Sequence, residues 1–407
     1  MGSPARPAPL YGRTYPEPVS RPVRVVPVTP GTVPALTAAL AAALDGSGPA
    51  VLPVGEQEDP PDAAGTVPDD VALLVRTSGS TGTPREVMLT AAALRASGEA
   101  TAARLGGHGH WLLPLPPAHV AGLQVLARSI LAGTGPTVLA GPFRAETFVD
   151  AVGGMPDGPG PRYTSLVPTQ LHRLLGSPAG LTALSTFDAV LLGGAASPPA
   201  LVRRARDAGA RVVTTYGMSE TCGGCVYDGV PLDGVQVDLA ADGRVAIAGP
   251  VLAAGYRGRP ELDAELFDVR GGARWLRTSD LGRWTDDDPP RLEVLGRADD
   301  VVVTGGVKVP PAAVERALAE RPGVGEVLVV GVPDPEWGRA LVAVVVAAPG
   351  GPAPDLADLR AAARRRLGGP AAPRHLVLVD ALPLRGPGKP DRAAAAALAA
   401  EAVGTGS

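Results

Sequence analysis

The chain has 407 residues, of which 45% are hydrophobic and 19% are charged, and its formal net charge is −4. This composition fits a folded globular protein, and a weakly acidic chain without a basic run excludes nucleic acid as an expected partner. Because single cores rarely exceed roughly 250–300 residues, we expect at least two domains. No apolar run reaches the ~18 residues of a membrane span, and Met1–Ser20 lacks a signal core, so we predict a cytoplasmic protein.

Residues 1–20 are predicted to form a flexible leader, and Pro and Gly recur from there to about Gly65. A helix is predicted over Val33–Leu44, between Thr32 and Gly46. From Val71 onward, short apolar runs alternate with helical segments, which predicts a largely parallel sheet covered by helices on both faces. The predicted strands are Val71–Arg76, Trp111–Leu115, Thr137–Ala140, Tyr163–Val167, Ala189–Leu192 and Arg211–Thr215, and helices are predicted from the cap Thr90 to Gly106 and near Gly122–Leu131, Pro168–Leu175 and Pro198–Ala208.

After Val235, short strands and turns predominate, which predicts a β-rich subdomain. Near Gly296 the pattern changes to a compact α+β unit that closes with an Ala-rich helix from Asp391. We place the boundary at Asp299, which gives domains of residues 1–298 and 299–407. The predicted fold class is therefore α/β: a large domain with mixed or parallel sheets between helices, a β-rich subdomain, and a small α+β domain.

The two cysteines, Cys222 and Cys225, form a C-x-x-C pair. Structural zinc sites generally take four ligands, and no second Cys/His pair exists in the sequence to complete one. A thioredoxin-like role requires a helix start in a small βαβ unit, whereas these residues flank two glycines in a predicted loop. We therefore expect two small buried thiols.

Only two of the 37 basic residues are lysines, Lys308 and Lys389. The bias toward arginine runs along the whole chain, which indicates a compositional drift. Because guanidinium and ammonium groups differ in shape and hydration, a lysine that survives this drift suggests a site that needs an ammonium group. Chance survival is the alternative for both residues.

A loop rich in Gly, Ser and Thr directly follows the strand predicted at Val71–Arg76. Its N–H and O–H groups suit phosphate oxygens. It differs from the G-x-x-x-x-G-K-[ST] loop of other nucleotide-binding proteins, and a flexible surface loop is the alternative. The loop reads Thr77-Ser78-Gly79-Ser80-Thr81-Gly82-Thr83-Pro84-Arg85.

A second motif, Tyr216-Gly217-Met218-Ser219-Glu220-Thr221, also follows a predicted strand. An aromatic, a hydroxyl and a carboxylate at the C-terminal end of a strand suit a base, a phosphate and Mg²⁺, although an ordinary turn is the alternative. Two weaker motifs come later in the chain. Asp280, within Thr278–Gly282, is suited to chelate ribose hydroxyls, and Gly296-Arg297-Ala298-Asp299-Asp300 follows it.

In this order the motifs resemble those of the adenylate-forming superfamily, which contains acyl-CoA synthetases, peptide-synthetase adenylation domains and firefly-luciferase-like enzymes. The resemblance runs from about Val71 to Arg392 and implies an enzyme that uses ATP and Mg²⁺ to activate a carboxylic acid, with coenzyme A as acceptor. It implies that Ser78–Thr83 hold the β- and γ-phosphates, with Thr77 and Arg85 beside them, and that Ser219 meets the α-phosphate. Adenine would be framed by Gly193-Gly194-Ala195, Tyr216 and Gly217, and ribose would be bound by Asp280 and Arg297. The resemblance also implies that Glu220 is catalytic and ligates Mg²⁺.

The segment Gly386–Arg392 resembles the catalytic-lysine motif of this superfamily. The resemblance implies that Lys389 is the ammonium group that bridges the substrate carboxylate and the ribose or phosphate oxygens during adenylation. It also implies that Asp299 is the hinge of a mobile C-terminal lid. Lys308 lies in the segment that the family presents in its thioester-forming conformation, so we expect a lesser role for it.

Two features depart from the family pattern. The family has Pro-Lys-Gly at the end of the phosphate loop, where this chain has Pro84-Arg85-Glu86. The planar guanidinium and the added anion predict either a slower enzyme or a substitution that the loop geometry accommodates. A third alternative is a degenerate enzyme that has lost activity. The loop also begins at residue 77, earlier than in most relatives, which predicts an abbreviated N-terminal subdomain and a small substrate pocket.

The acid is predicted from two further stretches, Leu115–Ser129 and Ser165–Leu171. They resemble the corresponding stretches of o-succinylbenzoate–CoA ligases, which act in menaquinone biosynthesis. The resemblance implies a small aromatic carboxylic acid, o-succinylbenzoate, bound by His119, Ser165 and Thr169, and it leaves a homo-oligomer possible. For His119, a helix-start histidine satisfied by the backbone is the alternative.

The implied mechanism has two half-reactions, adenylation of the acid by ATP and transfer of the acyl group to coenzyme A. Two alternative functions share every ATP motif and are therefore not separated by them. One is a ligase for another aryl or acyl acid, and the other is a stand-alone enzyme that loads a carrier protein. An ATPase or kinase-like enzyme would release ADP instead of AMP and pyrophosphate. A non-catalytic nucleotide-binding homologue is the fourth alternative.

Overall fold

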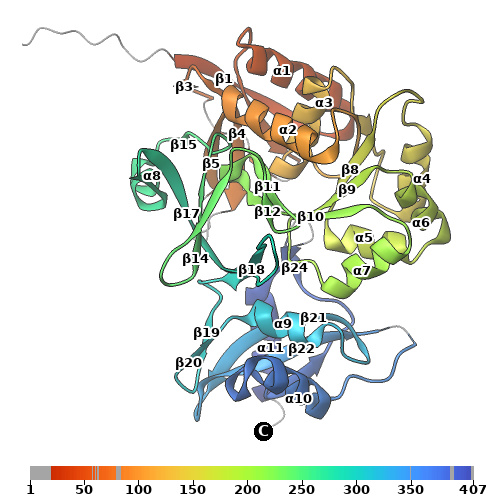
Figure 1. Cartoon of the computed structure of the whole chain (residues 1–407), viewed down its shortest axis with the longest axis vertical. Coiled ribbons are helices and arrows are strands. Elements are labelled where there is room, and N and C mark those ends of the chain that lie inside the picture. The colour runs from red at the N-terminus through yellow and green to blue at the C-terminus, as the bar shows by residue number, and fades with distance from the viewer. Residues whose placement is uncertain are drawn as a thin grey trace, which may run out of the picture.

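The structure is a computed structural model that describes residues 20–56, 58–59, 61, 64–78, 84–348, 350–385 and 389–404. Figure 1 shows two parts, a larger one built from the N-terminal and central elements and a smaller one that contains the elements from β19 to the C-terminus. None of the helices in these ranges is long and apolar enough to cross a membrane.

The first sheet has six strands in the order β15-β5-β4-β2-β1-β3. β1, β2 and β4 run parallel, whereas β3, β5 and β15 are antiparallel to their neighbours. The antiparallel pair β4–β5 flanks the predicted phosphate loop, of which residues 79–83 lie outside the described residues. The strands are β1 (Ser20–Val28), β2 (Ala50–Gly55), β3 (Thr66–Pro68), β4 (Val71–Ser78), β5 (Pro84–Thr90) and β15 (Gly255–Tyr256).

The second sheet has seven strands in the order β12-β11-β10-β9-β8-β6-β7. The five strands from β10 to β7 are parallel, as the alternating pattern predicted, and β11 and β12 continue the sheet in antiparallel fashion. The strands are β6 (His110–Leu113), β7 (Thr137–Val138), β8 (Arg162–Leu166), β9 (Ala189–Leu192), β10 (Val212–Met218), β11 (Gly223–Tyr227) and β12 (Val230–Pro231).

Alternating side chains of the second sheet enter two different cores. Trp111 and Leu191 join a core shared with the first sheet and with α1 to α3, whereas Leu112 and Val190 join a core under α4 to α7. This alternation is the period of two of a strand, and both faces are apolar because both are covered. The helices are α1 (Val33–Asp45), α2 (Ala91–Leu105), α3 (Val120–Leu131), α4 (Ala145–Gly153), α5 (Pro168–Leu175), α6 (Pro178–Ser185) and α7 (Pro199–Asp207), with single 3₁₀ turns η1 (Pro30–Thr32) and η2 (Ser219–Thr221).

The predicted β-rich region is an antiparallel five-stranded sheet whose long central strand, β17, pairs with β14, β16 and β18. This sheet brings Asp280 and Arg297 opposite each other on β17 and β18. Its elements are β13 (Gln236–Leu239), β14 (Arg244–Ala248), α8 (Pro260–Leu266), β16 (Phe267–Arg270), β17 (Ala273–Trp284) and β18 (Leu292–Arg297).

The C-terminal part is an α+β unit with a three-stranded sheet, β21-β22-β23. One face of this sheet packs against α9 and α10 and the other against α11, each over its own apolar core. The elements are the hairpin β19 (Val302–Thr304) and β20 (Val307–Val309), α9 (Pro311–Leu318), β21 (Val324–Asp334), β22 (Gly338–Ala347), α10 (Leu356–Leu367), η3 (Gly369–Ala371), β23 (His375–Leu378), the pair β24 (Leu384–Arg385) and β25 (Lys389–Pro390), and α11 (Arg392–Gly404).

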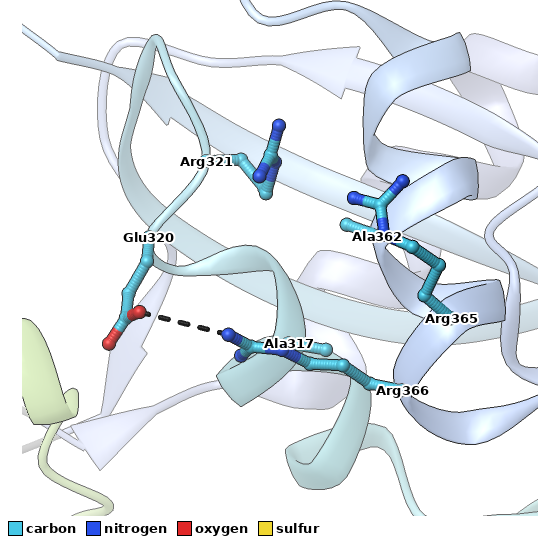
Figure 2. Close-up of a pocket in the computed structure, with 6 residues that line it drawn as sticks. All are labelled: Ala317, Glu320, Arg321, Ala362, Arg365 and Arg366. Atoms are coloured by element: carbon cyan, nitrogen blue, oxygen red, sulfur yellow. Dashed lines mark ion pairs between the residues drawn. The ribbon is translucent and has the colours of Figure 1, made fainter.

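Polar contacts join the two parts. Arg203 on α7 lies 2.5 Å from Glu320, and Arg316 on α9 donates to the carbonyl of Val294 on β18 at 3.1 Å. Figure 2 shows that Glu320 also faces Arg366, 3.9 Å away, across a hollow of about 200 Å³ between α9 and α10. The hollow is lined by Ala317, Glu320, Arg321, Ala362, Arg365 and Arg366.

Several elements differ from the sequence-based expectations. The region before Gly65 contains strands β1 and β2 in addition to the expected helix, because prolines at 22, 27 and 53 interrupt the sequence pattern of a half-buried and a buried strand. Of the predicted leader, residues 1–19 lie outside the described residues and Ser20 begins β1. The predicted cap of α2 is confirmed, since the Thr90 hydroxyl accepts from the N–H of Ala93 and Gly106 follows with a φ of 96°.

Candidate active site

The predicted nucleotide residues gather at one edge of the second sheet. Gly193, Tyr216 and Ser165 belong to or directly follow the C-terminal ends of the parallel strands β9, β10 and β8. In open α/β sheets, ligands bind at this edge. Gly193 is packed against β10, because a Cβ on it would lie 2.3 Å from the Thr215 hydroxyl oxygen, and its N–H donates to the carbonyl of Leu166.

Tyr216 and Asp280 meet across two sheets. The Tyr216 hydroxyl donates to Asp280 Oδ2 at 2.8 Å. Arg297 lies 4.0 Å from the other oxygen, Oδ1, and pairs more closely with Asp299 at 2.6 Å. Oδ1 is thus the less engaged carboxylate oxygen, and it is the acceptor that a sugar hydroxyl needs.

Burial controls the protonation of this pair. It raises the pKa of Asp280, against the Tyr216 hydrogen bond and the charge of Arg297, which both lower it. Burial, followed by the charge of Asp280, raises the pKa of Tyr216 far above its usual range. The phenol therefore keeps its proton at neutral pH and acts as the donor to the carboxylate.

A second tyrosine–carboxylate pair lies at the start of η2. The Tyr256 hydroxyl donates to Glu220 Oε1 at 2.6 Å, and the main-chain carbonyl of Glu220 accepts from the N–H of Ala253. Burial, followed by the charge of Glu220, raises the pKa of Tyr256, whereas the nearby charge of Arg85 lowers it. Tyr256 thus contacts the carboxylate predicted to ligate Mg²⁺, and Arg85 lies near that tyrosine.

The turn that carries Ser219 and Glu220 is held by hydrogen bonds between the Thr221 hydroxyl and the neighbouring backbone. The Thr221 hydroxyl accepts from the N–H of Met218 and donates to the carbonyl of Gly223 at 2.7 Å. Gly217 must be glycine here, because a Cβ would lie 2.0 Å from that same carbonyl oxygen. Ser219 is buried beside this turn, so its position is set by β10 and β11 together.

The donor set fits Mg²⁺ bound mainly by a nucleotide. In the part of the chain that the structure describes, no group of three or more His, Cys, Asp or Glu side chains stands ready to hold a metal. Mg²⁺ usually takes one or two protein carboxylates and completes its shell with phosphates and water. Glu220, with one oxygen held by Tyr256, suits that arrangement.

The predicted acid-binding residues lie around α3 and α5. His119 is the N-cap of α3, Ser165 is buried on β8, and Thr169 is half-buried in the first turn of α5. Ser165 and Thr169 thus lie at the edge that carries Gly193 and Tyr216, whereas His119 begins the helix that follows β6.

Two buried polar side chains on α3 were not singled out from the sequence. Gln124 is 1% exposed, and neither of its amide atoms has a hydrogen-bond partner among the described residues. Arg128, one turn later, is 5% exposed; its guanidinium donates to the Tyr227 hydroxyl at 3.3 Å and stacks on Trp111, and it faces no carboxylate within the described ranges. A buried cation without an anion is costly, and here the Tyr227 hydroxyl and the ring of Trp111 compensate that cost in part.

The last residue of the C-terminal motif, Arg392, binds groups on several elements of the C-terminal part. Arg392 bonds Glu315 at 2.6 Å, the carbonyl of Val329 at 2.9 Å and Asp300 at 3.0 Å. Lys389 lies on β25, whereas residues 386–388 lie outside the described residues. Lys308 is exposed on the β19–β20 hairpin, away from the edge that carries Tyr216.

Both cysteines are confirmed as free, buried thiols. Burial, and then the neighbouring Cys225, raise the pKa of Cys222, and burial raises the pKa of Cys225 to about 12. Thiols that stay protonated are poor nucleophiles and poor metal ligands. Both side chains belong to the apolar core beside η2.

Comparison with known proteins agrees with this geometry. The family model described as AMP-binding enzyme matches residues 21–257, and the model described as AMP-binding enzyme C-terminal domain matches residues 313–389. This chain belongs to the AMP-binding enzyme family. The two matches include the edge with Tyr216 and Glu220 and end at Lys389, so the family relationship spans both parts of the molecule.

Similarity to individual family members extends over almost the whole chain. A probable 2-succinylbenzoate–CoA ligase of Mycobacterium tuberculosis is 47% identical over 91% of this chain and 97% of its own length. The o-succinylbenzoate-CoA synthetase of Bacillus subtilis, solved with its acyl-adenylate intermediate, is 26% identical with a TM-score of 0.67, over 88% of this chain and 80% of the other. An amide bond synthetase of Marinactinospora thermotolerans is 30% identical with a TM-score of 0.72, over 92% and 79%.

Proposed function

We propose that this protein is an AMP-forming 2-succinylbenzoate–CoA ligase that works through an acyl-adenylate. The observation that carries the proposal is the end-to-end match, at 47% identity, with the M. tuberculosis protein named as a probable ligase of this kind. That protein shares the short length of this chain, which covers only 79% and 80% of the two solved structures. The early position of the phosphate loop predicts such a difference.

In the first half-reaction, an oxygen of the substrate carboxylate attacks the α-phosphorus of ATP, and the bond to pyrophosphate breaks. Asp280 and Tyr216 would hold the ribose, and Gly193-Gly194-Ala195 would frame the adenine. Mg²⁺, bound to Glu220 and the phosphates, would neutralise developing negative charge. Arg85 and the Lys389 ammonium group would do the same from the protein, and fixed charges of this kind contribute on the order of 10²–10³ each in rate.

In the second half-reaction, the coenzyme A thiolate attacks the acyl carbonyl carbon and AMP leaves. The C-terminal unit, from residue 299, would rotate about Asp299, withdraw Lys389 and present the hairpin with Lys308. Arg203–Glu320 and Arg316–Val294, which join the two parts, are exposed or half-buried, which is compatible with such a rotation. The cytoplasmic location and a homo-oligomeric state are predictions from the sequence.

The acid would lie at the sheet edge that carries Ser165 and Gly193, near His119 at the start of α3. 2-Succinylbenzoate carries two carboxylates, and only one of them reacts. Arg128 lies farther along α3, beside Trp111 and His108 near the start of β6, so it would not be expected to contact the second carboxylate. Ser165 and Thr169 would contact the remainder of the acid.

An acid panel tests the proposal. The purified protein would be given ATP, Mg²⁺ and coenzyme A with 2-succinylbenzoate, benzoate, ferulate or a medium-chain fatty acid, and AMP and acyl-CoA would be quantified. We expect 2-succinylbenzoate to give the highest kcat/KM. ADP as product, acyl-CoA only from another acid, or amide formation when an amine replaces coenzyme A would each contradict it.

A variant at Lys389 separates the two half-reactions. Lys389→Ala should abolish acid-dependent pyrophosphate release while sparing transfer to coenzyme A from pre-formed acyl-adenylate. Lys308→Ala is the matched lysine variant, and it should leave pyrophosphate release nearly unchanged. Equal loss of both half-reactions in Lys389→Ala would remove the assigned role.

A further inference from the structure

Glu86 stands at the centre of a three-strand charge cluster. Arg76 on β4, Glu86 on β5 and Arg257, which follows β15, lie side by side across the first sheet. Glu86 Oε1 lies 3.3 Å from Arg76 Nε, and its Oε2 lies 3.1 Å from Arg257 Nη1. One carboxylate thus joins two guanidinium groups from the strands on either side.

Both arginines are also tied to the main chain of the preceding loop. Arg76 donates to the carbonyl of Asp59 at 2.6 Å, and Arg257 donates to the carbonyl of Ala64. The side chains of Arg76, Glu86 and Arg257 are 13%, 17% and 21% exposed. At this degree of burial, removal of the central anion leaves two guanidinium groups uncompensated, so the cluster depends on Glu86 more than an exposed pair would.

The opposite face of the same strands points toward the site. Tyr256 is the cross-strand partner of Val87, and Arg85 lies two residues before Val87, so both side chains share that face. The charge of Arg85 reaches the Tyr256 hydroxyl, which donates to Glu220. The positions of Arg85 and Tyr256 therefore depend on β5 and β15, which the Glu86–Arg257 ion pair joins on the opposite face of the sheet.

We propose that Glu86 is a positioning residue for the triphosphate: it fixes β4, β5 and β15 so that Arg85 and Tyr256 meet Glu220 and the β- and γ-phosphates of ATP. The departure from Lys-Gly to Arg85-Glu86 is then one coordinated change. Arg85 presents its charge to the nucleotide, and Glu86 turns to the other strand face, where two arginines neutralise it. The inference rests on the proposed use of ATP and names no acid.

Nucleotide binding separates positioning from a general structural role. Calorimetric titration with ATP and with AMP, in Mg²⁺ and without acid, would compare wild type with Glu86→Gln and Glu86→Asp. AMP lacks the β- and γ-phosphates, so it reports on the Tyr216–Asp280 corner and the α-phosphate position without them. For Glu86→Gln we expect ATP binding to weaken about tenfold, or about 1.4 kcal/mol, and AMP binding to change less than about twofold.

Asp358→Asn is the matched control, because Asp358 is an arginine-paired carboxylate on α10 of the C-terminal part. It should lower the melting temperature without altering the ratio of ATP to AMP affinity. Glu86→Asp keeps the charge and should recover part of the ATP affinity, which keeps the test valid if Glu86→Gln folds poorly. Equal weakening of ATP and AMP, or no change in either, would overturn the inference, whereas a wild type that binds no ATP would overturn the proposed function instead.

Discussion

The two tyrosine–carboxylate pairs of the site are alike in chemistry and different in surroundings. Tyr216–Asp280 joins the edge of the parallel sheet to the antiparallel sheet, and its cation, Arg297, is engaged mainly by Asp299. Tyr256–Glu220 joins η2 to the first sheet, and its cation, Arg85, lies on a strand beside the phosphate loop. Under the proposed function, the same hydrogen bond would orient one carboxylate for neutral hydroxyls and another for the metal and phosphates.

Glu220→Gln tests the phosphate half of this comparison and should have the largest effect. The amide cannot supply a full anionic ligand, so acid-dependent pyrophosphate release should fall on the order of 10²–10³-fold. AMP affinity should stay within about twofold, measured by calorimetry. An equal loss of AMP and ATP affinity would show that the two pairs do not divide the nucleotide between them.

Asp280→Asn tests the ribose half and should weaken AMP and ATP alike, on the order of 10²-fold, because charge-assisted hydrogen bonds contribute about 1.5–3 kcal/mol each. The apo-protein should at the same time become more stable. Since the pKa of Asp280 is raised in the folded state, stability is lost as the pH rises from the unfolded pKa, near 3.9, through the folded value.

The stability gain of Asp280→Asn should therefore vanish below about pH 3.5 and increase as the pH rises from there to neutrality, where a melting temperature above that of the wild type is expected. Differential scanning calorimetry at both pH values measures it. A gain that is independent of pH would assign the effect to packing instead of charge.

Tyr216→Phe and Tyr256→Phe compare the two hydroxyls directly, and each should lower kcat/KM for ATP about tenfold. Only Tyr216→Phe should move the acidic limb of the pH profile to higher pH, because the lost hydrogen bond lowers the pKa of Asp280 in the wild type. Identical profiles for the two variants would contradict the division of roles.

Arg203→Ala should have the smallest effect, because Arg203 and Glu320 are 60% and 30% exposed and such pairs contribute about 0–1 kcal/mol. Acid-dependent pyrophosphate release should change less than about twofold at low salt and not at all in 0.5 M salt, where exposed pairs are screened. A loss above about tenfold would show that this contact holds the two parts in a functional arrangement.

Local chemistry made much of the molecule predictable. The capped helix α2, the parallel strands and the order of the motifs all follow from short sequence patterns. The pairs themselves do not, since Tyr216 and Asp280 are 64 residues apart and Glu220 and Tyr256 are 36 apart, and only packing between sheets brings them together. No short sequence pattern predicts that these side chains form a hydrogen bond.

Signals for the missed residues were present but weak. Tyr256 is one of six tyrosines in a chain with 3% aromatic residues, and this scarcity was the signal in the sequence that could have pointed to it. Gln124 and Arg128 interrupt an otherwise apolar stretch on α3, a pattern that predicts buried polar contacts. The position of Glu86 next to the phosphate loop in the sequence predicts an anion near the phosphates. Strand alternation instead turns its side chain to the opposite face of the sheet.

The contacts of Arg392 bear on how family members may be recombined. Because Arg392 binds Glu315, Val329 and Asp300, the strand with Lys389 and the residue after the predicted hinge are held in one unit. A chimera that takes its C-terminal unit from a relative should therefore have its junction before residue 300. A junction within that unit would separate Arg392 from its acidic partners and disturb the lysine that the exchange was meant to preserve.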